Sequence, residues 1–116
     1  MTEEQYLAYV QRGQPPALPE KALQAAVVRL LKQHQYLVYH TWDSRRSPSG
    51  FPDLLACHEQ PGHMALALEL KTASGHVTLP QQAWLGSLAQ CTGIYAAVVR
   101  PADLAALVAR LREDTP

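Results

Sequence analysis

Two short apolar runs, each bounded by turn-forming residues, constrain the fold of this chain most strongly. They occupy residues 54–57 and 64–68, and the turn residues Pro61 and Gly62 lie between them. Apolar runs this short, set between turn signals, are typical of buried strands. The two runs therefore predict a hairpin within a sheet.

Charged side chains stand at the ends of both predicted strands. Asp53 precedes the first strand, and Glu69 and Lys71 follow the second. Because side chains alternate along a strand, Glu69 and Lys71 are expected on one face, about 7 Å apart. Ala65 and Ala67 share that face and keep it shallow. Two carboxylates and an ammonium group that converge at strand ends are suited to a hard cation and a phosphodiester.

The length and composition fit one soluble globular domain. The chain has 116 residues, of which 47% are hydrophobic and 17% charged, as is usual for a domain with its own core. No apolar run approaches the ~18 residues of a membrane helix, and the start of the chain, rich in Glu and Gln, is no signal peptide. We therefore expect a cytosolic protein whose Cys57 and Cys91 are reduced and buried. A net charge of zero argues against a large phosphate-tracking surface and leaves room for a local one.

The hydrophobic periodicity and the turn residues predict the order of the elements. These are a helix at 1–13, a linker at 14–18, a helix at 19–33, strands at 36–40, 54–57 and 64–68, a helix at 78–90, a strand at 95–99 and a helix from 101. The strands before and after the helix at 78–90 can pair in parallel, and the first three form a meander. The fold class is therefore α/β, a mixed sheet flanked by helices.

Glu20 has an unusual position for an acid at the start of a helix. It lies three residues before Leu23 and seven before Val27, so helical spacing places it on the buried stripe. A carboxylate aimed at the core needs a partner. The alternative is that Glu20 only interacts favourably with the helix dipole.

Two further groups of polar residues are candidates for function. The loop 41–49 carries Arg45 and Arg46 beside hydroxyl groups, which could hold phosphate or simply be solvated. Thr78 and Gln81 have the spacing of a capping box, and that role alone explains Gln81. Gln81 also lies on the inward stripe of its helix.

Taken together, these residues resemble the VRR-NUC branch of the PD-(D/E)xK nuclease superfamily, the virus-type replication and repair nucleases. The branch has an acid at the head of its first core helix, a loop ending in Gly-x-Pro-Asp, a Glu-x-Lys strand and a glutamine opening the next helix. The matching positions are Glu20, residues 50–53, residues 69–71 and Gln81, in preference to Gln82. The resemblance covers residues 19–111, and further matches occur at His40, Asp43, Arg45 and Arg46.

The resemblance implies an αβββαβ restriction-endonuclease-like core and a DNA endonuclease that uses Mg²⁺ or Mn²⁺. The expected substrates are branched DNA, such as four-way (Holliday) junctions or flaps, as in DNA repair. Asp53, Glu69 and the Leu70 carbonyl would bind the cation, all through oxygen. Glu20 would hold a second metal ion or a water on the first.

The resemblance also assigns the remaining roles. Lys71 would orient or help to deprotonate the attacking water and offset negative charge. Gln81 would position that water or the Lys71 head. The residues expected to contact nucleic acid are His40, Ser44, Arg45 and Arg46.

Small free-standing members of the branch resemble dimeric phage enzymes. We therefore expect a homodimer in the cytoplasm of a bacterial or phage-infected cell. Residues 1–18 would form a helix and linker in front of a nuclease domain at 19–116. The apolar residues of the helix at 1–13 would cover either their own core or a partner subunit.

Three other interpretations compete with the nuclease. The first is a catalytically idle module of the same fold that holds DNA for a partner repair or replication protein. The second is a zinc site, for which the candidates are His34, His40, His58, His63, His76 and Cys57. In that set only His58 and His63 have a ligand-like separation. The third makes Glu69 and Lys71 a surface ion pair, which would contribute at most ~1 kcal/mol.

Overall fold

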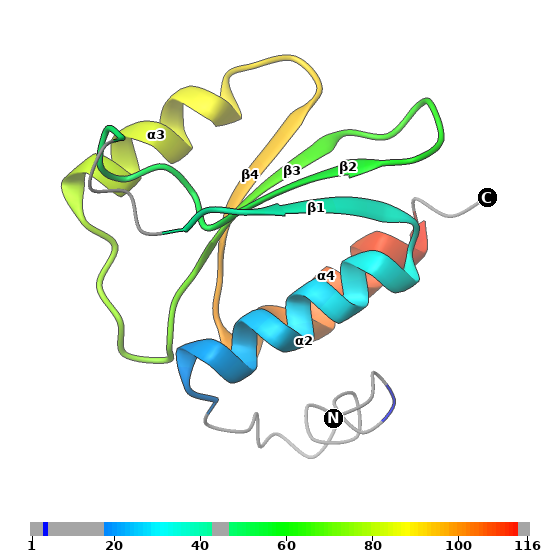
Figure 1. Cartoon of the computed structure of the whole chain (residues 1–116), viewed down its shortest axis with the longest axis horizontal. Coiled ribbons are helices and arrows are strands. Elements are labelled where there is room, and N and C mark those ends of the chain that lie inside the picture. Colours follow the sequence, from blue (N-terminus) through cyan, green and yellow to red (C-terminus); the bar gives the residue numbers. More distant parts are fainter. Residues whose placement is uncertain (1–3, 5–17, 43–46, 114–116) are drawn as a thin grey trace.

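The computed structural model of the protein describes residues 4, 18–42 and 47–113. Within these ranges the chain forms a four-stranded sheet with helices packed on both faces (Figure 1). The elements are α2 (Glu20–Gln33), β1 (Tyr36–His40), β2 (Leu54–His58), β3 (Ala65–Leu70), α3 (Leu79–Ala89), β4 (Ile94–Val99), a 3-10 turn η1 (Pro101–Asp103) and α4 (Leu104–Glu113). From the helix at residue 20 onward, the predicted order of helices and strands is confirmed.

The sheet has the mixed topology that the sequence predicts. Its strands lie in the order β1-β2-β3-β4. The pairs β1–β2 and β2–β3 are antiparallel, and β4 runs parallel to β3. β3 is therefore a central strand with a partner on each side, and its register places Leu68 opposite Leu54 on β2 and Ala97 on β4.

The hydrophobic core lies between the sheet and the helix pair α2 and α4. These two helices run side by side across one face of the sheet (Figure 1). Leu66, Leu68 and Leu70 of β3 point into this layer and are at most 1% exposed. Because strand side chains alternate, Glu69 points to the opposite face, on the side of α3. There it is the buried charged side chain of the described residues, at 2% exposure.

The face of the sheet away from α2 and α4 is covered less completely than the sequence suggests. α3 packs mainly against β4 and contains no buried residue, and in β4 only Val99 is buried. The apolar run at 95–99 predicts a further buried strand, and that prediction is wrong for all of its residues except Val99. The predicted burial of Cys57 and Cys91 is also wrong, because both are exposed free thiols. Cys57 lies on the outer face of β2, and Cys91 follows the end of α3.

The predicted helix at 1–13 and the linker at 14–18 lie almost wholly outside the described residues. Glu4 is helical, and Leu18 packs against the core. The division into 1–18 and 19–116 stays a prediction. None of the described helices is both long enough and apolar enough to cross a membrane.

Candidate active site

The loop before β2 is fastened at both ends, and this fixes the position of Asp53. At one end, the Thr41 backbone N–H donates to the Asp53 carbonyl (2.8 Å), and the Thr41 hydroxyl donates to the Pro52 carbonyl (2.9 Å). At the other end, Gly50 has a φ of +96° and lies against the first turn of α3. A Cβ at Gly50 would stand 2.5 Å from the Pro80 backbone carbon. The close approach and the left-handed backbone both require glycine here.

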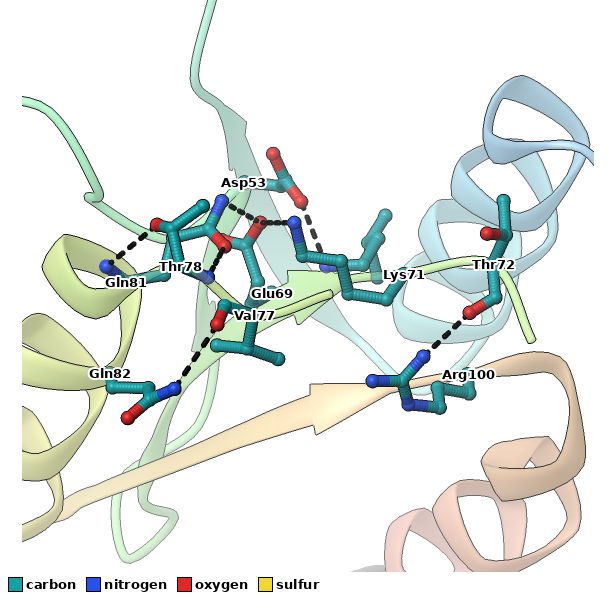
Figure 2. Close-up of polar contacts among 10 residues, drawn as sticks. Asp53, Glu69, Lys71, Thr72, Val77, Thr78, Gln81, Gln82 and Arg100 are labelled. Carbon is teal, nitrogen blue, oxygen red and sulfur yellow. Dashed lines mark hydrogen bonds and ion pairs between the residues drawn. The ribbon is translucent and has the colours of Figure 1, made fainter. Parts of the chain in front are cut away.

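Asp53 is joined directly to β3. Its Oδ2 accepts a hydrogen bond from the Leu70 backbone N–H at 2.7 Å. The acid at the mouth of β2 is thereby held beside the strand that carries Glu69 and Lys71, as Figure 2 shows. The predicted convergence of these three side chains is observed.

Glu69 is the central side chain of the cluster. Its Oε1 accepts a hydrogen bond from Gln81 Nε2 (3.1 Å) and lies 3.9 Å from Lys71 Nζ (Figure 2). Its Oε2 is buried and has no hydrogen-bond partner among the described residues. An unpartnered buried carboxylate oxygen is costly, which makes this atom a candidate ligand for a group that binds here.

Gln81 combines the two roles that its position in the sequence suggests. Its backbone N–H donates to the Thr78 hydroxyl, and its side-chain Oε1 accepts from the Thr78 N–H. This capping box begins α3. The other end of the same amide donates to Glu69. The cap therefore holds the Gln81 side chain in the rotamer that reaches the acidic cluster.

The electrostatics of the cluster favour the protonated form of Glu69. Burial raises the pKa of this carboxyl from 4.5 to about 8, and the negative charge of Asp53 adds to that effect. Glu20 raises it further, whereas Lys71 lowers it. A positive ion would reverse the balance, because it would favour the ionised form of both carboxylates.

The donor set fits a hard divalent cation. In the part of the chain that the structure describes, no three His, Cys, Asp or Glu side chains are grouped so that they could hold a metal ion. A cation would therefore depend on the two carboxylates of Asp53 and Glu69 and on the Leu70 backbone carbonyl. All of these are oxygen ligands, as Mg²⁺ and Mn²⁺ prefer, and the unpartnered Oε2 of Glu69 supplies one of them.

Glu20 differs from its expected position. It is the first residue of α2 and is exposed, so the prediction that it lies on the buried stripe is wrong. The buried stripe of α2 is Leu23, Val27, Leu30 and Leu31. The buried part of α2 begins at Leu23, and the Glu20 side chain in the first turn is still exposed to solvent. The Glu20 charge nevertheless acts on Glu69.

The predicted nucleic-acid contacts are only partly described. His40 is half-buried, and its ring packs edge-on against Trp42 with centroids 4.8 Å apart. Ser44, Arg45 and Arg46 lie outside the described residues, as does Asp43. Their roles stay predictions.

The zinc interpretation has no geometric support among the described residues. His58 and His63 stack face to face, with ring centroids 3.6 Å apart and an angle of 10° between the planes. His58 Nδ1 also accepts a hydrogen bond from the Gln60 N–H, so this nitrogen is not free to bind a metal ion.

Two features of the site were not predicted from the sequence. One is Thr41, whose two hydrogen bonds fasten the loop. The other is the pair Phe51 and Trp84, whose rings meet edge-on with centroids 5.2 Å apart. The signal for the pair was an aromatic residue inside the Gly50–Asp53 loop, where a polar residue is more usual.

The fold and the site together define a class of protein. An Asp at the head of one hairpin strand and a Glu-x-Lys on the next, in a mixed sheet between helices, is the arrangement of the PD-(D/E)xK nucleases. The sequence model of the VRR-NUC domain matches residues 3–103, and the chain therefore belongs to the VRR-NUC family.

A solved structure supports the fold. It is called a "VRR_NUC domain protein" and superposes with a TM-score of 0.58 at 17% identity, over 84% of this chain and 88% of that chain. No curated protein sequence matches the chain. The predicted fold class and family are confirmed, and the family is one of nuclease domains.

Proposed function

We propose that the protein is a metal-dependent DNA endonuclease that hydrolyses phosphodiester bonds. The observation that carries this proposal is Glu69, a carboxyl group at 2% exposure whose Oε2 has no partner within residues 18–42 and 47–113 and whose neighbours are Asp53 and Lys71. A fold gains nothing from placing two carboxyl groups together at a buried position. A bound cation would offset the repulsion between these two carboxylates, and it could also bind a phosphate.

The residues that would hold Mg²⁺ or Mn²⁺ are Asp53, Glu69 and, through its carbonyl, Leu70. When bound, such a cation offsets charge on the phosphate and lowers the pKa of a coordinated water. Glu69 must lose its proton before Oε2 can act as a ligand, and its raised pKa makes that loss dependent on pH. Glu20, which is exposed at the start of α2, would hold a second ion or a water.

Lys71 and Gln81 are the two side chains of the site that would act without binding the cation. The Lys71 side chain is 17% exposed, and its Nζ lies 3.9 Å from Glu69 Oε1, so the side chain is shielded yet open to a ligand. It orients the attacking water and stabilises the charge that grows on the phosphate oxygens. Gln81 keeps Glu69 in position through its amide hydrogen bond.

The proposed substrate is branched DNA, and the proposed assembly is a homodimer. His40, Ser44, Arg45 and Arg46 would contact the phosphate backbone near the site. Each chain offers a single acidic cluster among its described residues, so symmetric cutting of two strands needs two copies. Four-way junctions and flaps are the substrates to test first.

The test is cleavage of labelled duplex, flap, fork and four-way DNA with Mg²⁺ or Mn²⁺. Asp53→Asn, Glu69→Gln and Lys71→Ala should each reduce cleavage by about 10²-fold or more, with DNA binding retained. Excess EDTA should abolish cleavage, and Ca²⁺ should support binding without turnover. Glu59→Gln, an exposed acid beyond the far end of β2, is the matched control and should cleave normally.

Two outcomes would contradict the proposal. Unaltered cleavage by purified Asp53→Asn would show that the acidic cluster is not the active site. Tight DNA binding without cleavage of any substrate, with either cation, would instead identify an idle binding module that works with a partner protein.

A further inference from the structure

We propose that a pocket beside the acidic cluster takes one unpaired nucleobase of the DNA substrate. This aromatic pocket is lined by Tyr39, Thr41, Ser47, Pro48, Phe51 and Trp84 and has a volume of about 310 Å³. The inference rests on the proposed nuclease function and adds to it a base-binding subsite.

The lining of the aromatic pocket has the chemistry of a stacking site. Three of its residues are aromatic, and Phe51 and Trp84 meet edge-on at an angle of 77°, so they present faces in two directions. The Tyr39 side chain is 63% exposed on the outer face of β1. Among the described residues that line the pocket, none carries a charge. A flat, neutral ring with polar edges fits this surface better than a phosphate does.

The hydroxyl groups of the pocket suit the polar edges of such a ring. Thr41 uses its hydrogen to bind the Pro52 carbonyl, which leaves its oxygen free to accept from a ligand. Ser47 is exposed at the rim and can donate or accept. A nucleobase offers both donors and acceptors on its edges, as this pair of hydroxyls requires.

The position of the aromatic pocket relates its occupant to the reaction. Phe51 precedes Asp53 by two residues, which span at most ~7 Å of chain. Neighbouring bases on a strand are ~3.4 Å apart when stacked and farther apart when unstacked. The base in the pocket would therefore belong to a nucleotide next to, or one removed from, the phosphate held at Asp53 and Glu69.

The aromatic pocket and the acidic cluster are also joined rigidly. Thr41 lines the pocket and fastens the loop that carries Asp53. Trp84 lies on α3, whose first turn packs against Gly50 and supplies Gln81 to Glu69. Figure 1 shows the described part of the loop between β1 and β2 lying beside α3. A base in the pocket would thus fix the register of the strand relative to the cluster.

Filling the aromatic pocket requires a base outside the duplex stack. Taking a paired base out of a duplex costs a few kcal/mol, and an already unpaired base at a junction or flap costs less. Stacking on aromatic side chains stabilises the bound base by ~1–3 kcal/mol. The pocket therefore favours substrates with unpaired bases near the cut, which is a physical basis for selection of branched DNA.

The experiment uses the full chain with Asp53→Asn, which keeps the DNA intact, and Trp42→Phe, which leaves Trp84 as the single tryptophan. Flap and junction oligonucleotides are prepared with one abasic nucleotide at each position around the cut site mapped with wild-type protein. Removal of the base at one position should weaken binding about tenfold. Removal at that position should also abolish the quenching of Trp84 fluorescence by DNA.

Two exposed residues on the same face of β1 give a matched comparison. Tyr39 is 63% exposed and lines the aromatic pocket, whereas Leu37 is 62% exposed and does not. In the Tyr39→Ala background the penalty for that abasic position should disappear, and Tyr39→Phe should restore it. Leu37→Ala should keep the full penalty.

Three outcomes would overturn the inference. If DNA affinity is the same for every abasic position while the wild type still cleaves, the base-binding pocket is contradicted and the nuclease proposal stands. Absence of both cleavage and DNA binding would overturn the proposed function and the pocket together. A Tyr39→Ala variant that changes the sedimentation of the protein and keeps the abasic penalty would identify the pocket as a protein contact.

Discussion

At the scale of the residue, Glu69 shows how a stability cost and a function can share one side chain. Its carboxyl group is buried beside Asp53, and the pKa is raised to about 8. Near neutral pH without a cation, the protonated form predominates. A cation at the site would displace that proton, so its affinity should increase as the pH rises towards 8.

The raised pKa gives a stability prediction with a definite sign. The folded state holds the Glu69 proton up to about pH 8, whereas the unfolded chain releases it near 4.5. The folded state therefore binds more protons in that window, and the free energy of unfolding falls as the pH rises. The contribution is fully present below the unfolded pKa and is lost as the pH rises through the folded pKa.

Urea denaturation in EDTA at pH 5 and pH 8 measures this effect. Glu69→Gln should remove a pH-dependent loss of roughly 3–4 kcal/mol and should be more stable than the wild type at the higher pH. Glu59→Gln, which changes an exposed acid, should keep the wild-type slope. Equal slopes for wild type and Glu69→Gln would show that Glu69 is not the group responsible.

At the scale of the element, α3 begins with a cap that also serves the site. Thr78 and Gln81 form the capping box, and the Gln81 amide continues to Glu69. The box could be predicted from the sequence, because it depends on four neighbouring residues. Its reach to Glu69 depends on how α3 sits on β3 and β4, which local periodicity does not specify.

The two roles of Gln81 can be separated by a pair of variants. Thr78→Ala removes the cap and should cost about 1 kcal/mol of stability, while the Gln81–Glu69 contact can still form. Gln81→Ala removes the side-chain half of the capping box and that contact together, while the Gln81 backbone N–H can still donate to the Thr78 hydroxyl. We expect Thr78→Ala to retain most of its cleavage rate and Gln81→Ala to lose a much larger share at a similar melting temperature. Equal losses of cleavage would assign Gln81 to the cap alone.

The elements also show which parts of the fold the sequence could specify. The hairpin, the Glu-x-Lys strand and the apolar stripe of α2 follow from residues that are close in the chain, and all were predicted. The half-exposed faces of β4 and α3, and the exposure of Cys57, were not. They depend on how much of the outer sheet face one short helix can cover. The aromatic pocket combines Tyr39, Phe51 and Trp84 from three separate segments, so no local sequence pattern predicts it.

At the scale of the whole molecule, the question is how many copies act together. If Asp53, Glu69 and Lys71 form the proposed active site, one chain would cut one strand per encounter. Paired cuts at a four-way junction need two clusters related by a two-fold axis, which a C₂ dimer supplies. The segment 1–13 carries Tyr6, Leu7, Tyr9 and Val10 in front of a proline-containing linker. An amphipathic helix there would have to cover its own core or a partner.

We predict that this segment holds the dimer together. Sedimentation should give a dimer for the full chain at tens of micromolar and a monomer for a chain that starts at Ala17. The truncated chain should still nick DNA, because its acidic cluster is intact, but it should lose paired cleavage of a four-way junction. Leu7→Ser should weaken the dimer in the same direction, and Gln11→Ser, a polar change in the same segment, should not. A full-length monomer that still makes paired cuts would show that one chain resolves the junction alone.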